Sequence, residues 1–273
     1  MITFRSLGQL GRFGNQLFQY AGTRLYAETH GFAHAFPTWI GAQVFNNIAT
    51  YTLTEQLLAS ILPTIQLDDI QSYGVKQKIA FALGLSPSLP YTVSLSSLYA
   101  HPRDHKNLFG YLQDHKSLSL LAQHKEKVRT WFSFHDKISS AYTKATRNLS
   151  PWIGVHVRRG DLVKRGVTVP LHSFLEKLDS VRNGRPVFVA SDDPNMHSEF
   201  AHCDPIRIRN PLPEVPREIF DFWMLTQSRA IIGCGSTFSW WAAYISGTQE
   251  YYAPLLTHLW PAGYIPVLEQ QSI

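Results

Sequence analysis

Two adjacent arginines end an apolar run near the middle of the chain. Residues 152–157 are mostly β-branched or aromatic and predict a buried strand. The four residues that follow are Arg158, Arg159, Gly160 and Asp161. Guanidinium groups are planar, permanently charged forks that match phosphate oxygens in pairs, and a glycine lets the backbone come close to a ligand. The loop therefore predicts diphosphate binding, although an arginine pair at a strand end also suits ordinary salt bridges or a solvent-facing surface.

Two other loops in the second half carry side chains suited to a nucleotide. The first contains Asp192 and Asp193, whose carboxylates can accept hydrogen bonds from guanine N–H groups or a ribose hydroxyl. The second contains Ser236 and Thr237 just before a predicted helix, where hydroxyls and free backbone N–H groups favour phosphate. With the arginines, these loops supply the groups needed to hold a nucleoside diphosphate without a metal.

Strands and helices alternate around these three loops. Apolar runs predict strands, and apolar residues at helical spacing predict helices. The strands are expected at 152–157, 186–190 and 230–233, and the helices at 172–181, 218–228 and 238–246. Such alternation favours a parallel sheet, in which ligands lie beyond the carboxyl ends of the strands. The three loops are therefore expected to converge, and Asp221 lies on the second of these helices.

The N-terminal stretch has a related pattern of strand, glycine loop and helix. Residues 2–7 predict a strand, and a loop with three glycines follows it, the last being Gly14. Asn15 is expected to cap the next helix and Gly31 to end it. The glycine spacing matches neither the dinucleotide fingerprint nor the phosphate-binding loop. A tight packing turn is therefore as consistent with this sequence as a ligand loop.

The composition is that of a folded protein with an anionic partner. Hydrophobic residues make up 44% of the 273 residues and charged residues only 16%, which excludes a disordered chain. The length suits one large domain or two domains of roughly 130 residues each. The net charge of +5 indicates an anionic partner, but the 25 basic residues form no long run. A nucleotide or an acidic membrane surface therefore accounts for the positive charge as well as nucleic acid does. Because no nucleic-acid-binding motif is present, no nucleic acid is expected.

Cysteine usage and hydropathy indicate a cytoplasmic protein that does not span a membrane. The two cysteines, Cys203 and Cys234, cannot build a disulfide framework or a four-cysteine zinc site. Met1 is not followed by a basic segment and an apolar signal region, so secretion is not expected. The longest uncharged stretches, 31–54 and 230–249, contain polar residues at a density that a bilayer span rarely tolerates.

Four blocks of the sequence carry a family resemblance. They are residues 11–21 (GRFGNQLFQYA), 156–161 (HVRRGD), 191–193 (SDD) and 235–244 (GSTFSWWAAY). Together and in this order they resemble the α-1,2-fucosyltransferases of glycosyltransferase family 11, in their bacterial form. The resemblance implies an α/β, GT-B-like fold of two Rossmann-like domains, with the donor site in the cleft between them. Residues 1–150 would form the acceptor-side domain and residues 151–273 the domain that binds GDP-fucose.

The resemblance also implies a reaction and its partners. The donor would be GDP-β-L-fucose, and fucose would pass with inversion to the 2-hydroxyl of a terminal β-galactose on an oligosaccharide acceptor. No metal, no other cofactor and no nucleic acid would take part, and peripheral contact with the inner membrane surface stays open. Two alternatives remain: a GDP-fucose-dependent transferase with another acceptor or linkage, and a non-catalytic module that binds a GDP-sugar.

By the same resemblance, Arg158 would contact the donor diphosphate and stabilise the charge that develops on it. Gly14 and Asn15 would approach the phosphate or the fucose. Of the other residues, Asp192 or Asp193 would contact the nucleoside, and Asp221 the guanine. Ser236 and Thr237 would contact the phosphates, and Arg159 and Asp161 would order the loop or line the donor pocket.

The general base is not assigned by the sequence. A carboxylate or histidine near the anomeric carbon would suit, and His156 and Asp161 are the nearest candidates along the chain. His156 is equally consistent with a buried core histidine. Residues 110–113 (GYLQ) depart from the family pattern, which has an aromatic before the glutamine, and this departure puts acceptor selectivity in question.

Overall fold

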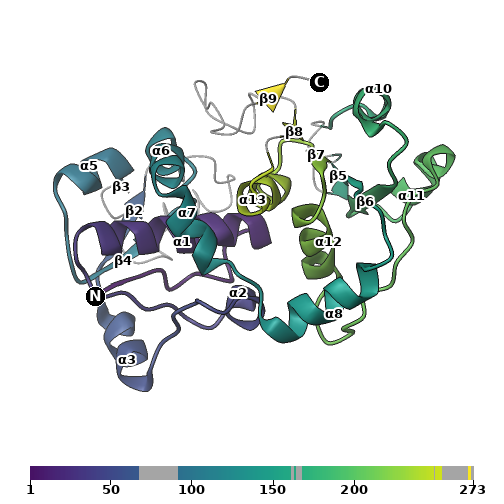
Figure 1. Cartoon of the computed structure of the whole chain (residues 1–273). Helices are drawn as coiled ribbons and strands as arrows, with labels where there is room; N and C mark the ends of the chain where they lie inside the picture. The colour runs from purple at the N-terminus through teal and green to yellow at the C-terminus, as the bar shows by residue number, and fades with distance from the viewer. Residues whose placement is uncertain (68–91, 161–162, 164–167, 249, 254–269, 272–273) are drawn as a thin grey trace. The chain divides into compact units, whose positions relative to one another are not determined.

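The structure of the protein is a computed structural model, shown in Figure 1. It describes residues 1–67, 92–160, 163, 168–248, 250–253 and 270–271. The chain divides into two compact units, Met1–Trp131 and Phe132–Ile273. Each unit contains a parallel sheet with helices, which is the α/β class that the sequence predicts. Within the part of the chain that the structure describes, no helix combines the length and the apolar character that a membrane span requires.

The boundary between the units lies earlier than the expected residue 150. The reason is α8 (Asp136–Thr146), which belongs to the second unit. Its Tyr142 ring packs edge-on against the rings of Phe220 and Trp223, with centroid distances of 4.9 and 5.4 Å. Residues 132–150, which were expected in the first domain, therefore belong to the second unit.

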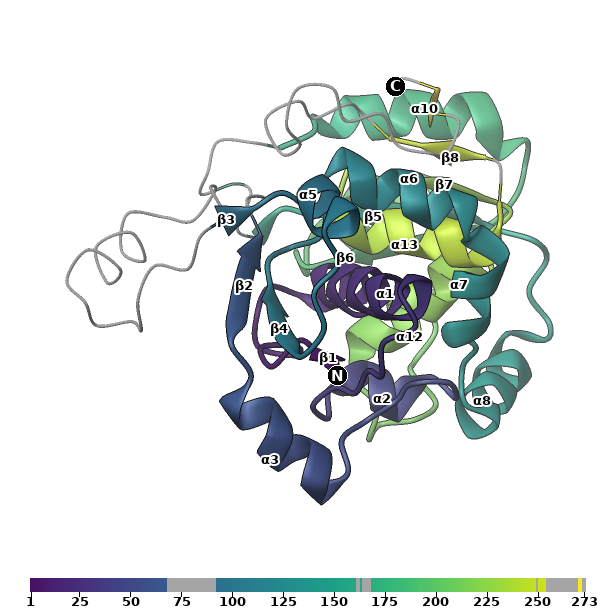
Figure 2. The ribbon, with the colours of Figure 1, turned by 90° about the vertical axis from the view of Figure 1, so that its left-hand side faces the viewer.

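The sheet of the first unit has the strand order β1-β4-β2-β3, and each neighbouring pair is parallel. Its strands are β1 (Ile2–Thr3), β2 (Thr64–Leu67), β3 (Thr92–Val93) and β4 (Lys106–Phe109). Figure 2 shows β2 and β4 side by side. β1 is shorter than the expected strand at 2–7, because the backbone N–H of Arg5 donates to the Asn107 side chain at 2.8 Å. β2, β3 and β4 were not predicted, since short strands with polar residues lack a clear apolar run.

The first helix of the first unit, α1 (Phe13–Thr29), is also its longest described helix. The others that the structure describes are α2 (Ile40–Val44), α3 (Leu53–Ile61), α5 (Leu95–Ala100), α6 (His115–Gln123) and α7 (Lys125–Trp131). The prediction that Asn15 caps α1 is wrong: Arg12 is the N-cap, and Asn15 lies in the first turn of the helix. The sequence also predicts a helix at 55–61, which α3 confirms, and one at 75–83, which lies outside the described residues.

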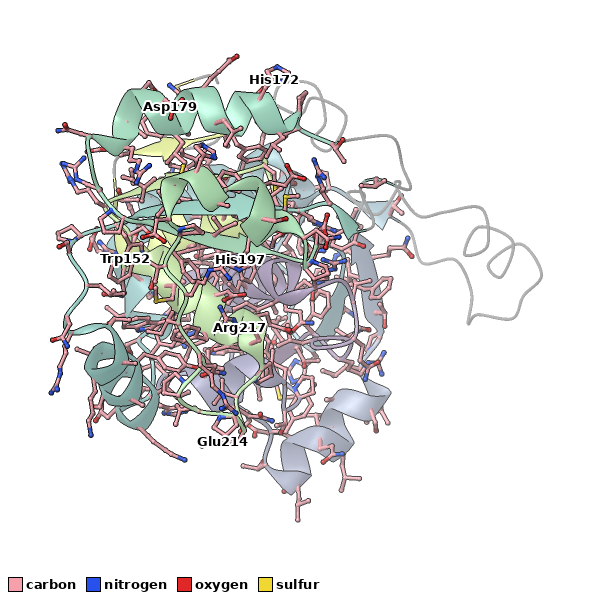
Figure 3. The ribbon with its side chains drawn as sticks, turned by 90° about the vertical axis from the view of Figure 1, so that its right-hand side faces the viewer. Trp152, His172, Asp179, His197, Glu214 and Arg217 are labelled. Atoms are coloured by element: carbon pink, nitrogen blue, oxygen red, sulfur yellow. The ribbon has the colours of Figure 1, made fainter. Side chains whose placement is uncertain are left out.

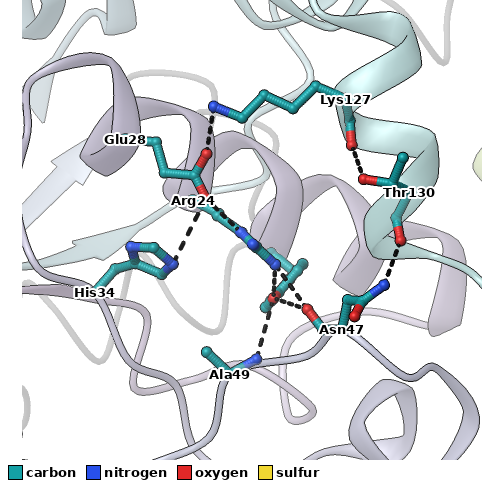
Figure 4. Close-up of polar contacts among 8 residues, drawn as sticks. Arg24, Glu28, His34, Asn47, Ala49, Lys127 and Thr130 are labelled. Carbon is teal, nitrogen blue, oxygen red and sulfur yellow. Dashed lines mark hydrogen bonds and ion pairs between the residues drawn. The ribbon is translucent and has the colours of Figure 1, made fainter.

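A polar network fixes α1 in addition to its burial, as Figure 4 shows. Arg24 Nε donates to Glu28 Oε1 at 2.7 Å, and Lys127 of α7 lies 2.5 Å from the same carboxylate. Arg24 Nη1 also donates to the Asn47 carbonyl at 2.7 Å, and the Asn47 amide donates to the Thr130 carbonyl at 2.7 Å. Burial raises the pKa of Glu28, but the two cations outweigh it and lower the pKa overall. The network ties α1 to α7 and to the segment after α2.

The sheet of the second unit has the strand order β6-β5-β7-β8-β9 and is parallel throughout. Its strands are β5 (Ile153–Val157), β6 (Val187–Ser191), β7 (Ala230–Ile232), β8 (Tyr251–Tyr252) and β9 (Gln270–Gln271). Its other helices are α10 (Leu171–Arg182), α11 (Met196–Glu199), η2 (Ala201–Cys203), α12 (Arg217–Thr226) and α13 (Thr237–Ser246). The three predicted strands and three predicted helices of this half are confirmed.

Helices cover both faces of this second sheet, with α10 on one side and α12 on the other in Figure 1. Alternate residues of β5 join a core with Phe174 and Leu178 of α10. On the opposite face, Gly154 leaves room for the end of α12. A Cβ at this position would lie 2.4 Å from Ser228 Oγ and 2.8 Å from Leu225 Cδ2. The glycine within the apolar run of β5 is therefore a packing requirement.

The order of the strands creates a place for a ligand between β5 and β7. The chain runs from β5 through α10 to β6 on one side, and from β7 through α13 to β8 on the other. Open α/β sheets bind ligands beyond the carboxyl ends of their strands, where the strand order reverses direction in this way. The arginine loop follows β5 and the segment 233–236 follows β7, so both flank this point.

Candidate functional site

The loop with the two arginines is held by the loop after the neighbouring strand. Asp192 Oδ1 accepts hydrogen bonds from the backbone N–H groups of Arg159 (2.8 Å) and Gly160 (3.1 Å). The register of the sheet explains this contact, because Val157 at the end of β5 pairs with Ser191 at the end of β6. The expected convergence of these two loops is confirmed, and a charged acceptor bound to two amides makes the arrangement rigid.

Asp193 also takes part in the geometry of its own loop. Its Oδ1 accepts from the backbone N–H of Asn195 at 3.0 Å, and its own N–H donates to Ser191 Oγ at 3.0 Å. Its Oδ2 lies 3.9 Å from the Arg159 guanidinium. This ion pair fits the loop-ordering role expected for Arg159. Asp161 lies outside the described residues.

The third loop meets the end of β5 through a buried histidine. His156 Nδ1 and Ser236 Oγ lie 3.2 Å apart, within hydrogen-bond distance, and the imidazole packs 5.0 Å from the Phe238 ring. The turn depends on Gly235, whose φ of +73° is in the left-handed region that favours glycine. Burial raises the pKa of the neighbouring Cys234 thiol, which is therefore neutral. The third loop thus converges with the first, as the sequence predicts.

This contact bears on the roles expected for Ser236 and His156. Ser236 is the N-cap of α13, yet its side chain makes no capping hydrogen bond. The side chains of Ser236 and His156 are both buried, with 3% and 7% of their surface exposed. The pair therefore orders the loop, while the partly exposed Thr237 is better placed to meet a phosphate. The burial of His156 fits the core alternative better than a base that an acceptor must reach.

Asp221 lies on α12 with an arginine from the first turn of the same helix. Arg217 Nε donates to Asp221 Oδ1 at 2.7 Å, and Arg217 Nη1 donates to the Ile208 carbonyl at 3.0 Å. Figure 3 shows Arg217 on α12 and Glu214 in the turn before the helix. Burial raises the pKa of Asp221 to about 6, although Arg217 opposes the shift. This carboxyl group therefore changes charge just below neutral pH.

The first unit presents its own group of polar side chains at the start of α1. Gly11 has a φ of +74°, and a Cβ at this position would lie 2.3 Å from Asn15 Nδ2. The side-chain amide of Gln16 donates to the Gly11 carbonyl at 3.2 Å, and that of Gln19 donates to the Leu10 carbonyl at 3.0 Å. The glycine loop is thus pinned to the helix that follows it, with Asn15 packed directly over Gly11.

Sequence reasoning did not include Gln113 among the site residues. Its side-chain amide Nε2 donates to Asn15 Oδ1 at 3.2 Å. Gln113 follows β4, which pairs with β1, so its loop and the glycine loop leave the same edge of the sheet. The block at 110–113 was the sequence signal that could have identified Gln113.

Among the described residues, no group of three or more His, Cys, Asp or Glu side chains is arranged to hold a metal ion.

Two solved structures with a similar fold are POFUT1 and the fucosyltransferase NodZ. The apo form of POFUT1 aligns with a TM-score of 0.55 and 16% identity, over 92% of this chain and 97% of that one. NodZ from Bradyrhizobium aligns with a TM-score of 0.56 and 13% identity, over 88% of this chain and 90% of that one. The chain therefore has the predicted GT-B-like α/β fold.

Two kinds of named relatives resemble the sequence. Galactoside alpha-(1,2)-fucosyltransferase 2 of Pongo pygmaeus is 25% identical over 273 residues, covering 90% of this chain and 70% of the relative. An alpha-1,2-colitosyltransferase of Escherichia coli is 29% identical over 143 residues, covering 45% of this chain and 46% of the relative. The sequence profile described as Glycosyl transferase family 11 matches residues 97–257. Because this match covers more than half of the chain and includes the arginine loop and the loop after β7, the protein belongs to glycosyl transferase family 11.

Proposed function

We propose that this protein is a galactoside α-1,2-fucosyltransferase that moves L-fucose from GDP-β-L-fucose to the 2-hydroxyl of a terminal β-galactose, with inversion. Membership of the family and relatives named for this activity support the proposal. The observation that carries it is the loop of Arg158 and Arg159, held at the carboxyl end of β5 by Asp192. A loop that carries two arginines at that edge suits a diphosphate.

The proposed chemistry follows from the negative charge that develops on the leaving diphosphate. The oxygen of the acceptor hydroxyl attacks the anomeric carbon as the bond to the β-phosphate oxygen breaks. The bonding electron pair leaves with GDP, and the hydroxyl proton passes to a base or to water. Arg158 and the backbone N–H groups near Thr237 stabilise the leaving diphosphate more strongly in the transition state than in the ground state. No metal or other cofactor is required by this scheme, in which the second unit binds the nucleotide.

Incubation of the purified protein with GDP-fucose and EDTA tests the proposal. The acceptor panel contains lactose, N-acetyllactosamine and galactosyl-β-1,3-N-acetylgalactosamine, and NMR determines the linkage of the product. We expect an α-1,2-fucosylated galactoside. Transfer that needs added metal would contradict metal independence. Thermal protection by GDP without transfer to any acceptor would favour a binding module. The absence of both transfer and thermal protection would overturn the proposal.

A second candidate donor is an activated colitose. The relative named alpha-1,2-colitosyltransferase is 29% identical over its matched region, compared with 25% for the fucosyltransferase of Pongo pygmaeus. The same acceptor panel with each donor in turn decides between them. A higher kcat/KM with colitose would change the sugar while leaving the linkage and the nucleotide site as proposed.

A further inference from the structure

We propose that Gln113 is a positioning residue that sets the orientation of the Asn15 side-chain amide, and that Leu112 holds Gln113 in place. The inference rests on the proposed function and on the approach of Asn15 to the donor phosphate or fucose that the family resemblance implies. Asn15 and Gln113 are 98 residues apart, and each follows a strand of the same parallel sheet. The chain thus brings a second loop to the functional start of α1.

The Asn15 amide is enclosed on two sides. Gln113 Nε2 donates to Asn15 Oδ1 at 3.2 Å. On the other side, Asn15 Nδ2 lies over Gly11, where a Cβ would come within 2.3 Å of it. An amide has one accepting and one donating end, so a donor at Oδ1 decides which way the N–H₂ group points. Gln113 therefore fixes the direction in which Asn15 can donate.

Leu112 is held in an unfavourable backbone conformation. Its φ is +53°, in the left-handed region that residues other than glycine rarely adopt, and its side chain is fully buried. The side chain packs against Gly22 of α1, where a Cβ would lie 2.6 Å from Leu112 Cδ2 and 3.0 Å from its Cβ. Such strain persists only where the surrounding packing imposes it, and it is concentrated at functional sites.

The residue after Gln113 is fixed as well. The Asp114 side chain accepts from the backbone N–H of Ser117 at 2.7 Å and caps α6. Gln113 therefore lies between a packed, strained Leu112 and a capped helix start. Gly22 and Asn15 are seven residues apart on α1, which places both on one face of the helix. Leu112 and Gln113 thus meet the same face of α1.

Two substitutions separate orientation from simple stabilisation. Gln113→Ala removes the donor. Gln113→Glu keeps the size but offers only acceptor oxygens when ionised, so the Asn15 amide must turn its N–H₂ group toward position 113. We expect both variants to lose about tenfold or more in kcat/KM for GDP-fucose, because small misplacements of catalytic groups are costly. We expect the melting temperature of Gln113→Glu to stay near that of the wild type.

A double-substitution cycle shows whether Gln113 acts through Asn15. Adding Gln113→Ala to Asn15→Ala should cost little beyond Asn15→Ala alone, since the group being oriented is already gone. Gln123→Ala is the matched control: this exposed glutamine of α6 lies 3.4 Å from Ser119 Oγ, and its loss should leave the kinetics unchanged.

The outcomes also separate this inference from the proposed function. Wild-type transfer with unchanged kinetics in Gln113→Glu would overturn the inference alone, as would additive losses in the double variant. Absence of transfer by the wild-type protein with every acceptor would overturn the proposed function and, with it, this inference. The inference is supported if Gln113→Ala and Gln113→Glu each lose kcat/KM and if the losses of Gln113→Ala and Asn15→Ala are not additive in the double variant.

Discussion

The carboxylate of Asp192 determines the position of the arginine loop. Because it accepts from the N–H groups of Arg159 and Gly160, its removal leaves two amides without their acceptor and releases Arg158 from its place. Asp192→Ala should therefore lower kcat/KM for GDP-fucose by roughly ten- to a hundredfold. Asp192→Asn keeps an acceptor oxygen and should lose less. Steady-state kinetics with varied donor measures both.

The rate loss in Arg158→Ala is the reference for the losses expected in the Asp192 variants. Loss of a group that stabilises transition-state charge typically costs about a hundredfold or more in rate, so Arg158→Ala should nearly abolish transfer. Asp179→Ala, at an exposed carboxylate of α10 labelled in Figure 3, is the control. Near-normal turnover in Arg158→Ala would remove the basis for the proposed role of the loop.

The raised pKa of Asp221 predicts a pH dependence of nucleotide binding. The folded protein raises this pKa from 3.8 to about 6, so the protonated form is favoured by folding. Its contribution to stability is present below the unfolded pKa and is lost as pH rises through about 6. The guanine contact that the family resemblance implies for Asp221 needs the ionised carboxylate as an acceptor, so GDP affinity should rise as pH rises through about 6.

Calorimetric titration of GDP between pH 5 and pH 7 tests this assignment. Wild-type affinity should fall about tenfold one pH unit below the pKa, because only a tenth of the carboxyl groups are then ionised. Asp221→Asn should bind GDP with a flatter pH profile, since it has no proton to gain. Identical profiles in the two proteins would exclude Asp221 from guanine binding.

The side chains of the site differ in how far the sequence could predict them. The arginine, aspartate and Ser-Thr loops each follow a strong apolar run, so their convergence could be inferred from the rule for parallel sheets. The hydrogen bond from Gln113 to Asn15 could not, because it joins residues 98 apart through β4, a strand that was not predicted. Ser236 was expected to bind phosphate, and its burial against His156 depends on the turn at Gly235.

Among the elements, β5 needs a glycine on the face covered by α12. Gly154→Ala would place a Cβ 2.4 Å from Ser228 Oγ and 2.8 Å from Leu225 Cδ2. Overpacking of this kind costs about 1–3 kcal/mol, and urea denaturation should show a lower midpoint. Gly184→Asn serves as the control, because no atom lies within 4 Å of its added Cβ and asparagine tolerates its φ of +70°. An unchanged midpoint for Gly154→Ala would contradict the close packing of α12 on β5.

The same contrast explains which elements the sequence predicts. β5, β6 and β7 are three to five residues long, and all but the last residue of β6 are buried, so they form apolar runs. β2 and β4 include Thr64, Gln66 and Asn107, which make hydrogen bonds or strand pairs within the sheet. Their strand character comes from pairing with distant segments and not from local preference, and a single sequence does not record that pairing.

At the level of the whole molecule, the family profile crosses the boundary between the two units. It matches residues 97–257, which include β4 and the 110–113 block of the first unit and most of the second unit. The residues shared with the family therefore extend beyond the sheet of the second unit. The sequence predicted two domains but placed the boundary at 150, because nothing local in α8 indicates that Tyr142 packs on α12.

Hydrogen exchange on the whole chain can divide the proposed roles between the units. GDP alone should slow exchange in the loops after β5, β6 and β7, since its diphosphate and guanine are proposed to meet that edge of the second unit. At a GDP concentration of 100 Kd, the binding energy of about 2.7 kcal/mol slows exchange through ligand-free openings by up to about a hundredfold. GDP-fucose should extend the protection to residues 11–15, where Asn15 is proposed to meet the phosphate or the sugar. Protection of residues 11–15 by GDP to the same extent as by GDP-fucose would mean that Asn15 senses the nucleotide and not the fucose, and protection confined to the first unit would place the donor there instead.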